Sequence, residues 1–403
     1  MGTMEGVRVV EVALYALGPA AAAILSDWGA DVVKIEHPAS GDPMRSLTYS
    51  GIDPGTNGFT FLWEIMNRGK RSVGLDLNQA EGREILFDLI RDADVFLTTL
   101  LPAGRRKLGI DVDDVRAANP RIIYARGSAY GPRGPEAEKG GFDALTYWHR
   151  TGMSTAVTPD PSQVPALPGP AFGDIQGAMT LASGIAAALF QRERTGIGCV
   201  VDTSLFAVGV WGMQSNLAGA NLLEADMLPA PNHFSPTNPP NEVYRTAEGR
   251  FIALTMPQTD HAWVRLCDVL GHSELAFDER FHDLDARRSN AADCVRALDE
   301  IFASKYLAEW CEILQQQDGQ WDVVRRVGEL NQDAQAWANG YLSNIEYDAE
   351  RSLTVVPAPV QFDQVSPVLR PAPELGAHTE EVLLELERDW PEIIRLKESQ
   401  VIS

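Results

Sequence analysis

The residue whose surroundings best suggest chemistry is Asp174, which lies among small residues in the segment 170–179, PAFGDIQGAM. An apolar stretch follows and runs to about Phe190, so we expect the carboxylate at the start of a helix. The positive end of a helix dipole favours the charged, nucleophilic form of a carboxylate, and Gly173 and Gly177 would leave room for a reacting atom. Asp is also a favoured helix N-cap, so a catalytic carboxylate and a plain cap are both open at this point.

The sequence lacks the residue spacings that mark several other kinds of functional site. No group of His, Cys, Asp and Glu has the spacing of metal ligands, and no Gly-x-Ser-x-Gly elbow is present. No Gly-x-Gly-x-x-Gly follows the first expected strand, so a dinucleotide is not indicated. We therefore expect no metal and no tightly bound cofactor. The four cysteines have no CxxC spacing and are typical of a reducing compartment: Cys199, Cys267, Cys294 and Cys311.

The overall charge of the chain limits the classes of molecule that we expect it to bind. The 403 residues include 56 Asp and Glu but only 34 Lys and Arg, which gives a formal net charge of −22. This balance argues against a nucleic-acid or membrane partner. The N-terminus has no basic region or cleavable apolar stretch, and the expected helix 175–190 is too short and too polar to span a membrane. The sequence predicts a cytoplasmic protein.

Short β-branched runs alternate with helical patterns through the first half of the chain. Such alternation predicts an α/β fold with a Rossmann-like, mostly parallel sheet covered by helices, and ligands at the carboxyl ends of its strands. The expected strands are 6–12, 31–36, 72–77, 94–98 and 121–126.

The second half has a different composition. A Pro/Asn-rich passage, 229–240, indicates a boundary, a hairpin is expected at 244–254 with its turn at Glu248-Gly249, and Thr379 would cap a terminal helix. We predict that residues 1–225 form the first part of a large domain that contains Asp174. Residues 226–345 would form a linker and a smaller α+β domain, and residues 346–403 would return to the large domain.

Four blocks of sequence, taken together and in this order, resemble the family III CoA-transferases, a superfamily that includes formyl-CoA transferase, carnitine CoA-transferases and α-methylacyl-CoA racemase. The resemblance covers nearly the whole chain and is weakest at about 215–242 and 319–335. The blocks are 18–36 (GPAAAAILSDWGADVVKIE), 67–77 (NRGKRSVGLDL), 170–179 with the exit Thr195–Gly198, and 373–379 (PELGAHT).

The resemblance implies a function for Asp174. It would attack an acyl-CoA thioester, pass through a mixed anhydride and an aspartyl-CoA thioester, and so move CoA to a carboxylic acid acceptor. Backbone amides of nearby glycine-rich loops would stabilise the oxyanions. The resemblance also implies an interlocked homodimer. CoA contacts would fall on Ala16, Leu17, His37, Leu75, Asp76, Leu77, Asn78, Thr99, Leu100, Leu101, Lys107 and Gly140.

Several of these positions depart from the family pattern. His37 and Lys107 stand where Arg is common, and Thr98-Thr99 replaces a Glu-Asn pair. Lys107 keeps a positive charge but lacks the bidentate fork that Arg offers to a phosphate. The basic segment 67–71 could contact phosphate or could serve the fold alone.

The alternatives are an α-methylacyl-CoA racemase or another acyl-CoA isomerase, and a catalytically inactive CoA-binding protein. The racemase branch typically carries a His in the segment that matches 140–143, where this chain has Phe142, which cannot move a proton. His149 lies nearby, and whether it has a role is open, as are the donor acid, the acceptor acid and the pathway. We expect acyl specificity in the smaller domain and the Pro/Asn-rich passage.

Overall fold

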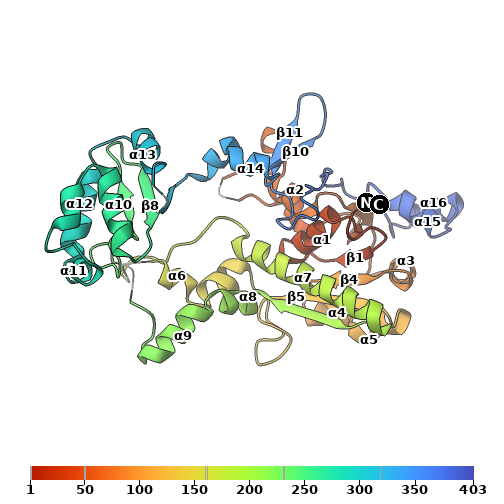
Figure 1. The fold of residues 1–403 in the computed structure, drawn as a ribbon. Coiled ribbons are helices and arrows are strands. Elements are labelled where there is room, and N and C mark those ends of the chain that lie inside the picture. Colours follow the sequence, from red (N-terminus) through yellow and green to blue (C-terminus); the bar gives the residue numbers. More distant parts are fainter. Residues whose placement is uncertain (1, 50, 159, 161, 230–231, 318) are drawn as a thin grey trace. The chain divides into compact units, whose positions relative to one another are not determined.

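The computed structural model describes residues 2–49, 51–158, 160, 162–229, 232–317 and 319–403. Pro231, in the Pro/Asn-rich passage, lies outside the described residues. The chain divides into two compact units. Unit 1 comprises Met1–Leu228 and Asp333–Ser403, and unit 2 comprises Pro229–Gln332. Figure 1 shows the fold and labels many of the elements. Within the described ranges, no helix combines the length and apolar character needed to cross a membrane.

A six-stranded parallel sheet forms the centre of unit 1, which confirms the mixed α/β expectation. The strand order is β3-β2-β1-β4-β5-β6. Because the order reverses between β1 and β4, the loops that follow these two strands separate and leave a crevice at the carboxyl edge of the sheet. The strands are β1 (Arg8–Val12), β2 (Asp31–Glu36), β3 (Arg71–Gly74), β4 (Val95–Thr98), β5 (Ile123–Ser128) and β6 (Val200–Ser204).

Successive strand residues face opposite sides of this sheet, so each side has its own core. Val9 and Val32 belong to the core that includes the Ala-rich helix α1 (Leu17–Asp27), α2 (Phe61–Asn67) and α7 (Phe172–Thr195). The neighbouring Val10 and Val33 belong to the other core, with α3 (Ala80–Arg91), α5 (Val112–Ala118), α15 (Thr379–Glu385) and α16 (Trp390–Glu398). Both faces are therefore apolar, as a buried parallel sheet requires.

Shorter elements complete unit 1. They are α4 (Pro102–Leu108), the π-helix η3 (Ala144–His149), α6 (Met153–Ala156), α8 (Leu205–Gly212), α9 (Gln214–Leu223), α14 (Ala334–Ala338), the hairpin of β10 (Ser343–Glu346) and β11 (Ser352–Val355), and the 3-10 turns η1 (Pro43–Ser46) and η2 (Thr56–Gly58).

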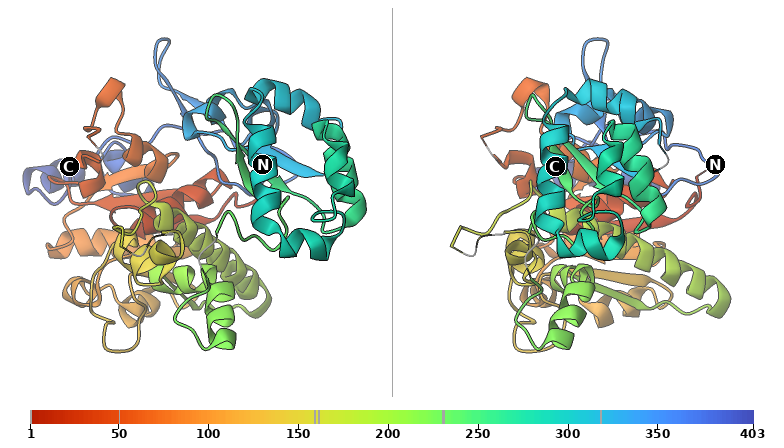
Figure 2. Two further views of the ribbon diagram at one scale, coloured as in Figure 1. Left: turned by 90° about the vertical axis from the view of Figure 1, so that its left-hand side faces the viewer. Right: turned by 60° about the vertical axis from the view of Figure 1, so that its left-hand side comes forward.

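The C-terminal segment completes the edge of the sheet. Ser403 N donates to the carbonyl oxygen of Gly74 (3.3 Å), and Leu75 forms a β-bridge with Ile402. In Figures 1 and 2 the blue C-terminal helices accordingly lie beside the red and orange N-terminal part of the chain. The expected cap at Thr379 is wrong. The N-cap of α15 is His378, because the Thr379 hydroxyl instead donates to the Gly376 carbonyl (2.8 Å).

Unit 2 has its own α+β core. Strands β7 (Val243–Arg245), β8 (Phe251–Thr255) and β9 (Gln320–Val323) form an antiparallel sheet, and the β7–β8 pair confirms the expected hairpin. The helices are α10 (Asp260–Leu270), α11 (Leu284–Ser289), α12 (Ala291–Phe302) and α13 (Leu307–Leu314), with 3-10 turns η4 (Ser273–Phe277) and η5 (Val327–Gln332).

Candidate active site

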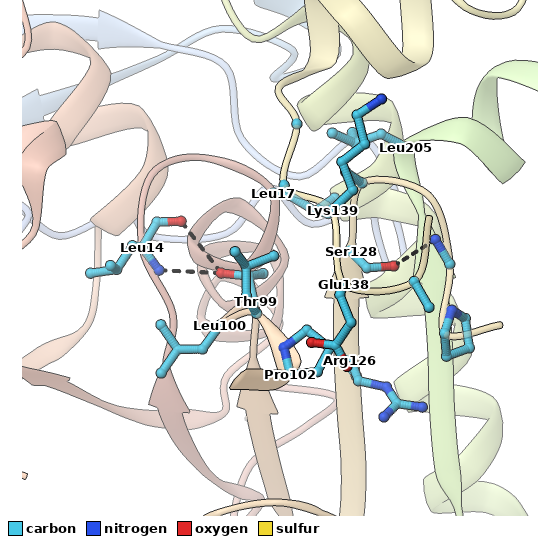
Figure 3. Close-up of a pocket in the computed structure, with 18 of the residues that line it drawn as sticks. Leu14, Leu17, Thr99, Leu100, Pro102, Arg126, Ser128, Glu138, Lys139 and Leu205 are labelled. Carbon is cyan, nitrogen blue, oxygen red and sulfur yellow. Dashed lines mark hydrogen bonds between the residues drawn. The ribbon is translucent and has the colours of Figure 1, made fainter. Parts of the chain in front are cut away.

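A cavity of about 710 Å³ lies at the carboxyl ends of β1, β4, β5 and β6, in the crevice that the strand order creates. Residues 14–17 after β1 and 99–102 after β4 form two of its walls, and residues 126–129 and 140–142 contribute others (Figure 3). Leu205, at the start of α8, and Asp174, on α7, also line it. The position agrees with the general rule for ligand sites in open parallel sheets.

Asp174 lies in the first turn of α7 but does not cap the helix. The N-cap is Ala171, which has a left-handed backbone (φ 55°) and makes no side-chain cap hydrogen bond. No described residue donates a hydrogen bond to the Asp174 carboxylate. The Asp174 carboxylate therefore lies on the cavity wall and does not cap the helix.

Burial raises the pKa of Asp174 to about 7, and the negative charge of Asp143 adds to this rise. The direction is opposite to the one expected from the helix dipole, because loss of hydration outweighs the dipole here. Asp143 is held in place from both sides. Its Oδ1 accepts the N–H of Ala144 (2.7 Å), and its Oδ2 accepts the N–H of Gly173 (3.1 Å).

The two glycines beside Asp174 serve packing. A Cβ at Gly173 would lie 2.4 Å from Cγ of Tyr147, and one at Gly177 would lie 2.6 Å from Cδ1 of Leu17. Both distances are shorter than side chains tolerate. The glycines therefore let α7 approach η3 and the start of α1, which differs from the expectation that they leave space for a reacting atom.

Polar contacts fix the loop that follows β1. Leu14 N donates to Thr99 Oγ1 (3.3 Å), and Tyr15 N, at a residue with φ 65°, donates to Asp42 Oδ1 (3.1 Å). Lys34 Nζ donates to the carbonyl oxygen of Ala13 (2.9 Å). A left-handed non-glycine residue persists only where its surroundings hold it, so these contacts determine the shape of this wall.

A buried cluster of charges supports the same loop. Lys34 Nζ lies 2.8 Å from Glu11 Oε1 and 2.9 Å from Asp42 Oδ2, and all three side chains are inaccessible to solvent. Lys70 Nζ lies 2.6 Å from Glu11 Oε2 and donates to the carbonyl oxygen of Pro19 (2.8 Å), in the first turn of α1. Glu11 thus connects two lysines that hold the two ends of the segment 13–19.

These contacts favour the structural interpretation of the basic segment 67–71. Besides the buried Lys70, Arg68 pairs with Asp27 (2.6 Å) and Arg71 pairs with Asp31 (2.6 Å). Each cation of the segment has a carboxylate partner within unit 1.

The structure brings together seven of the thirteen residues selected from the sequence. Those that line the cavity are Ala16, Leu17, Thr99, Leu100, Leu101, Gly140 and Asp174. The remainder do not line it. Leu75 and Leu77 are buried in the core, Lys107 is exposed on α4, and Asp76 and Asn78 follow β3. His37, which follows β2, has its Nε2 4.0 Å from Asp76 Oδ1. Their contact with CoA stays a prediction.

An aromatic pair on the cavity wall was not selected from the sequence. The rings of Tyr15 and Phe142 meet edge to face with centroids 5.3 Å apart, and both residues line the cavity. Phe142 was noted only as the replacement of a His, and Tyr15 carried no signal, because 127 residues separate them. His149 does not line the cavity, and its Nδ1 lies 3.0 Å from Ser154 Oγ.

Comparisons with known proteins cover nearly the whole chain. The model of the family described as CoA-transferase family III matches residues 4–379. The chain is 32% identical to an (R)-2-hydroxy-4-methylpentanoate CoA-transferase of Clostridioides difficile over 99% of each chain. It is also 32% identical to a succinate–glutarate CoA-transferase of Agrobacterium fabrum over 95% of this chain and 96% of that one. A crystal structure of a CAIB/BAIF family protein from Brucella suis superimposes with a TM-score of 0.81 at 26% identity, over 96% of this chain and 99% of that chain.

Proposed function

The chain belongs to CoA-transferase family III and is a CoA-transferase, and from this premise we propose that Asp174 is its nucleophile. The observation that carries the proposal is the Asp174 carboxylate itself, on the wall of the cavity at the sheet's crevice and without a hydrogen bond from any described residue. A pKa near 7 leaves a large fraction of this carboxylate ionised at neutral pH.

The reaction consists of four exchanges at carbonyl carbon. An Asp174 oxygen attacks the acyl-CoA thioester, the C–S bond breaks, and a mixed anhydride and CoA thiolate form. The thiolate attacks the Asp174 carbonyl carbon and releases the donor acid, which leaves an aspartyl-CoA thioester. The acceptor carboxylate then attacks this thioester and releases thiolate. Attack of the thiolate on the acceptor acyl carbon gives the new acyl-CoA and restores the Asp174 carboxylate.

The predicted CoA contacts that line the cavity are compatible with this chemistry. Ala16 and Leu17 follow β1, Thr99 follows β4, and Gly140 lies on the third wall, so one ligand could touch all four beside Asp174. Arg106 and Lys139 line the same cavity, and their side chains are about half exposed, which suits the phosphates of CoA.

Transfer is favoured over racemisation at this site. Inversion at carbon needs acid/base groups on two faces of the substrate. Phe142 occupies the cavity wall where the racemase branch typically has its His, and His149 does not line the cavity. No observation favours an inactive CoA-binding protein, since the Asp174 carboxylate is present and faces the cavity.

We also propose that units 1 and 2 are the large and small domains of an interlocked homodimer, and that the protein is cytoplasmic. Support comes from the family and from the discontinuity of unit 1, whose two parts flank unit 2 in the sequence. Light scattering at micromolar concentration should give the mass of a dimer, and a monomer would exclude this assembly.

Replacement of the nucleophile tests the central proposal. Asp174→Ala should abolish CoA transfer, whereas Asp113→Ala, on the exposed side of α5, should not. Wild-type protein incubated with an acyl-CoA donor should gain the mass of CoA less water on the peptide that contains Asp174, and hydroxylamine should release it. If Asp174→Ala keeps most of its activity, the nucleophile is another residue.

A further inference from the structure

We propose that this site transfers CoA between monocarboxylic acids with bulky apolar side chains, aromatic or branched, and discriminates against dicarboxylic acids. The inference rests on the proposed role of Asp174 and concerns which acyl groups reach it. It goes beyond CoA transfer itself, because the same chemistry could serve a charged or an apolar acid.

The cavity presents large apolar side chains that the protein itself leaves uncovered. Tyr15, Phe142 and Leu145 line it outside the predicted CoA contacts, with 36–57% of their surface exposed. Leu14 and Leu205 add further apolar wall (Figure 3). An apolar acyl group would remove this surface from water, which is the main source of affinity in pockets of this kind.

The Tyr15–Phe142 pair lines the same cavity as Asp174, and the chain at each of the two residues is held by a hydrogen bond. Phe142 precedes Asp143, whose carboxylate accepts the N–H of Gly173, so the chain at 142–143 is anchored to the first turn of α7. The Tyr15 backbone is bonded to the buried Asp42. Two aromatic rings at 84° to each other form an apolar corner that suits a ring or a branched chain.

The cations that line the cavity already have partners. Arg105 pairs with Asp111 (3.1 Å), and Arg126 pairs with Asp202 (2.5 Å). Their side chains are only 5% and 15% exposed.

Arg106 and Lys139 pair with Glu138 (3.0 Å) and Glu136 (2.9 Å), respectively. Thus, among the described residues of the lining, every Arg and Lys has a carboxylate partner. Arg105 and Arg126 are largely buried in their pairs, and Arg106 and Lys139 are the cations that we propose for the CoA phosphates. A second carboxylate on the substrate would therefore lose its hydration without gaining a free cation, which is unfavourable.

Three residues of the wall have a hydroxyl group, Tyr15, Thr99 and Ser128, and the last two use theirs within the protein. Thr99 Oγ1 accepts the N–H of Leu14, and Ser128 Oγ accepts the N–H of Gly131 (3.1 Å; Figure 3). Ser128 Oγ also donates to the carbonyl oxygen of Thr203 (3.3 Å). Apart from the Tyr15 hydroxyl, the side chains of the wall therefore offer few free hydrogen-bond donors to a charged acyl chain.

Isotope exchange between each acyl-CoA and its own ¹³C-labelled free acid tests the inference, because donor and acceptor then belong to one class. We expect kcat/KM for 3-phenylpropanoyl-CoA and 4-methylpentanoyl-CoA to exceed that for succinyl-CoA and glutaryl-CoA by about 100-fold. Equal or faster exchange of the dicarboxylic pairs would overturn the inference and leave Asp174 as the nucleophile. If no pair exchanges and no acyl-CoA attaches CoA to Asp174, the proposed function itself is refuted.

Variants of Phe142 separate an acyl contact from a CoA contact. Phe142→Ala should lower kcat/KM for 3-phenylpropanoyl-CoA about 10-fold while it leaves acetyl-CoA exchange nearly unchanged. Phe142→Tyr should keep the preference. Phe190→Ala, which removes an exposed ring farther along α7, is the matched control and should change neither rate. An equal loss for all thioesters, acetyl-CoA included, would place Phe142 against CoA and contradict the inference.

Discussion

The carboxylate of Asp143 accepts a hydrogen bond from the N–H of Gly173 at 3.1 Å, one residue before Asp174. This single contact joins η3, which Asp143 caps, to the first turn of α7. It also places a negative charge near the proposed nucleophile, where it contributes to the raised pKa of Asp174. The position of the start of α7 and the pKa of Asp174 therefore both depend on the Asp143 side chain. Substitutions at Asp143 can separate these two effects.

Asp143→Asn should move the pH profile of the transferase to lower pH. In the wild-type protein kcat/KM should rise with pH around 7, because Asp174 must lose a proton to attack. Asn can keep its one oxygen for the Gly173 N–H, gives up the acceptor for the Ala144 N–H and removes the charge, so activity at pH 6 should increase about threefold. Asp143→Ala removes the hydrogen bond as well and should lower activity at every pH. An unchanged or upward-shifted profile for Asp143→Asn would contradict the electrostatic role.

Asp174→Asn should stabilise the protein at neutral pH. Because the pKa of Asp174 is higher in the folded protein than in the unfolded chain, folding favours the protonated form. The stability that this proton contributes is complete below about pH 4 and is lost as pH rises through about 7. We expect Asn to raise the free energy of unfolding by about 1–2 kcal/mol at pH 8, allowing for partial exposure of the side chain. Urea unfolding at pH 8 and pH 4 measures this, and an equal gain at both values would point to another cause.

Gly173→Ala should damage both stability and activity. The added methyl group would meet the buried ring of Tyr147, which cannot move without displacing η3. We expect a loss of about 1–3 kcal/mol of stability together with at least tenfold lower kcat. Gly169→Ala, where a Cβ would meet nothing within 4 Å, is the control and should behave like the wild-type protein. A fully active Gly173→Ala protein would show that the start of α7 tolerates a shift.

Lys34→Met should be strongly destabilising. Burial alone would lower the pKa of Lys34, but Glu11 and Asp42 raise it, so the side chain is charged. Its removal leaves two buried carboxylates without that partner and should cost about 3–5 kcal/mol. Arg296→Met, at an exposed pair with Asp293, should cost less than about 1 kcal/mol. Similar midpoints of urea unfolding for the two variants would mean that the buried cluster contributes little.

Local sequence patterns predicted the strands of the sheet well. They did not show which charged residues near the sheet form ion pairs. The strand 31–36 was predicted with the bounds that the structure shows, because β-branched runs between helical segments are a local signal. The basic segment 67–71 illustrates the limit. Arg68 meets Asp27, which is 41 residues away, and Arg71 meets Glu385, which is 314 residues away, so the sequence could not show that these cations are neutralised.

The prediction for Asp174 also shows what local reasoning lacks. Its position near a helix start was predicted correctly, and the dipole argument gave it a low pKa. Burial in the fold reverses this, and the neighbour that adds to the rise in pKa, Asp143, lies 31 residues earlier and is one of many acidic residues. Sequence reasoning also looked for acyl specificity in the second half of the chain, whereas the aromatic pair that we propose for it lies in the first.

The division of unit 1 by unit 2 has a consequence for the order in which the molecule can form during synthesis. Unit 2 is continuous and can fold as soon as residue 332 has left the ribosome. The sheet of unit 1 must wait for 333–403, because α15 and α16 supply part of one of its two cores and Ser403 binds the edge strand. Until then an apolar face of the nascent sheet stays uncovered. Chaperones that bind apolar surfaces would therefore act on residues 1–228 while unit 2 is already folded.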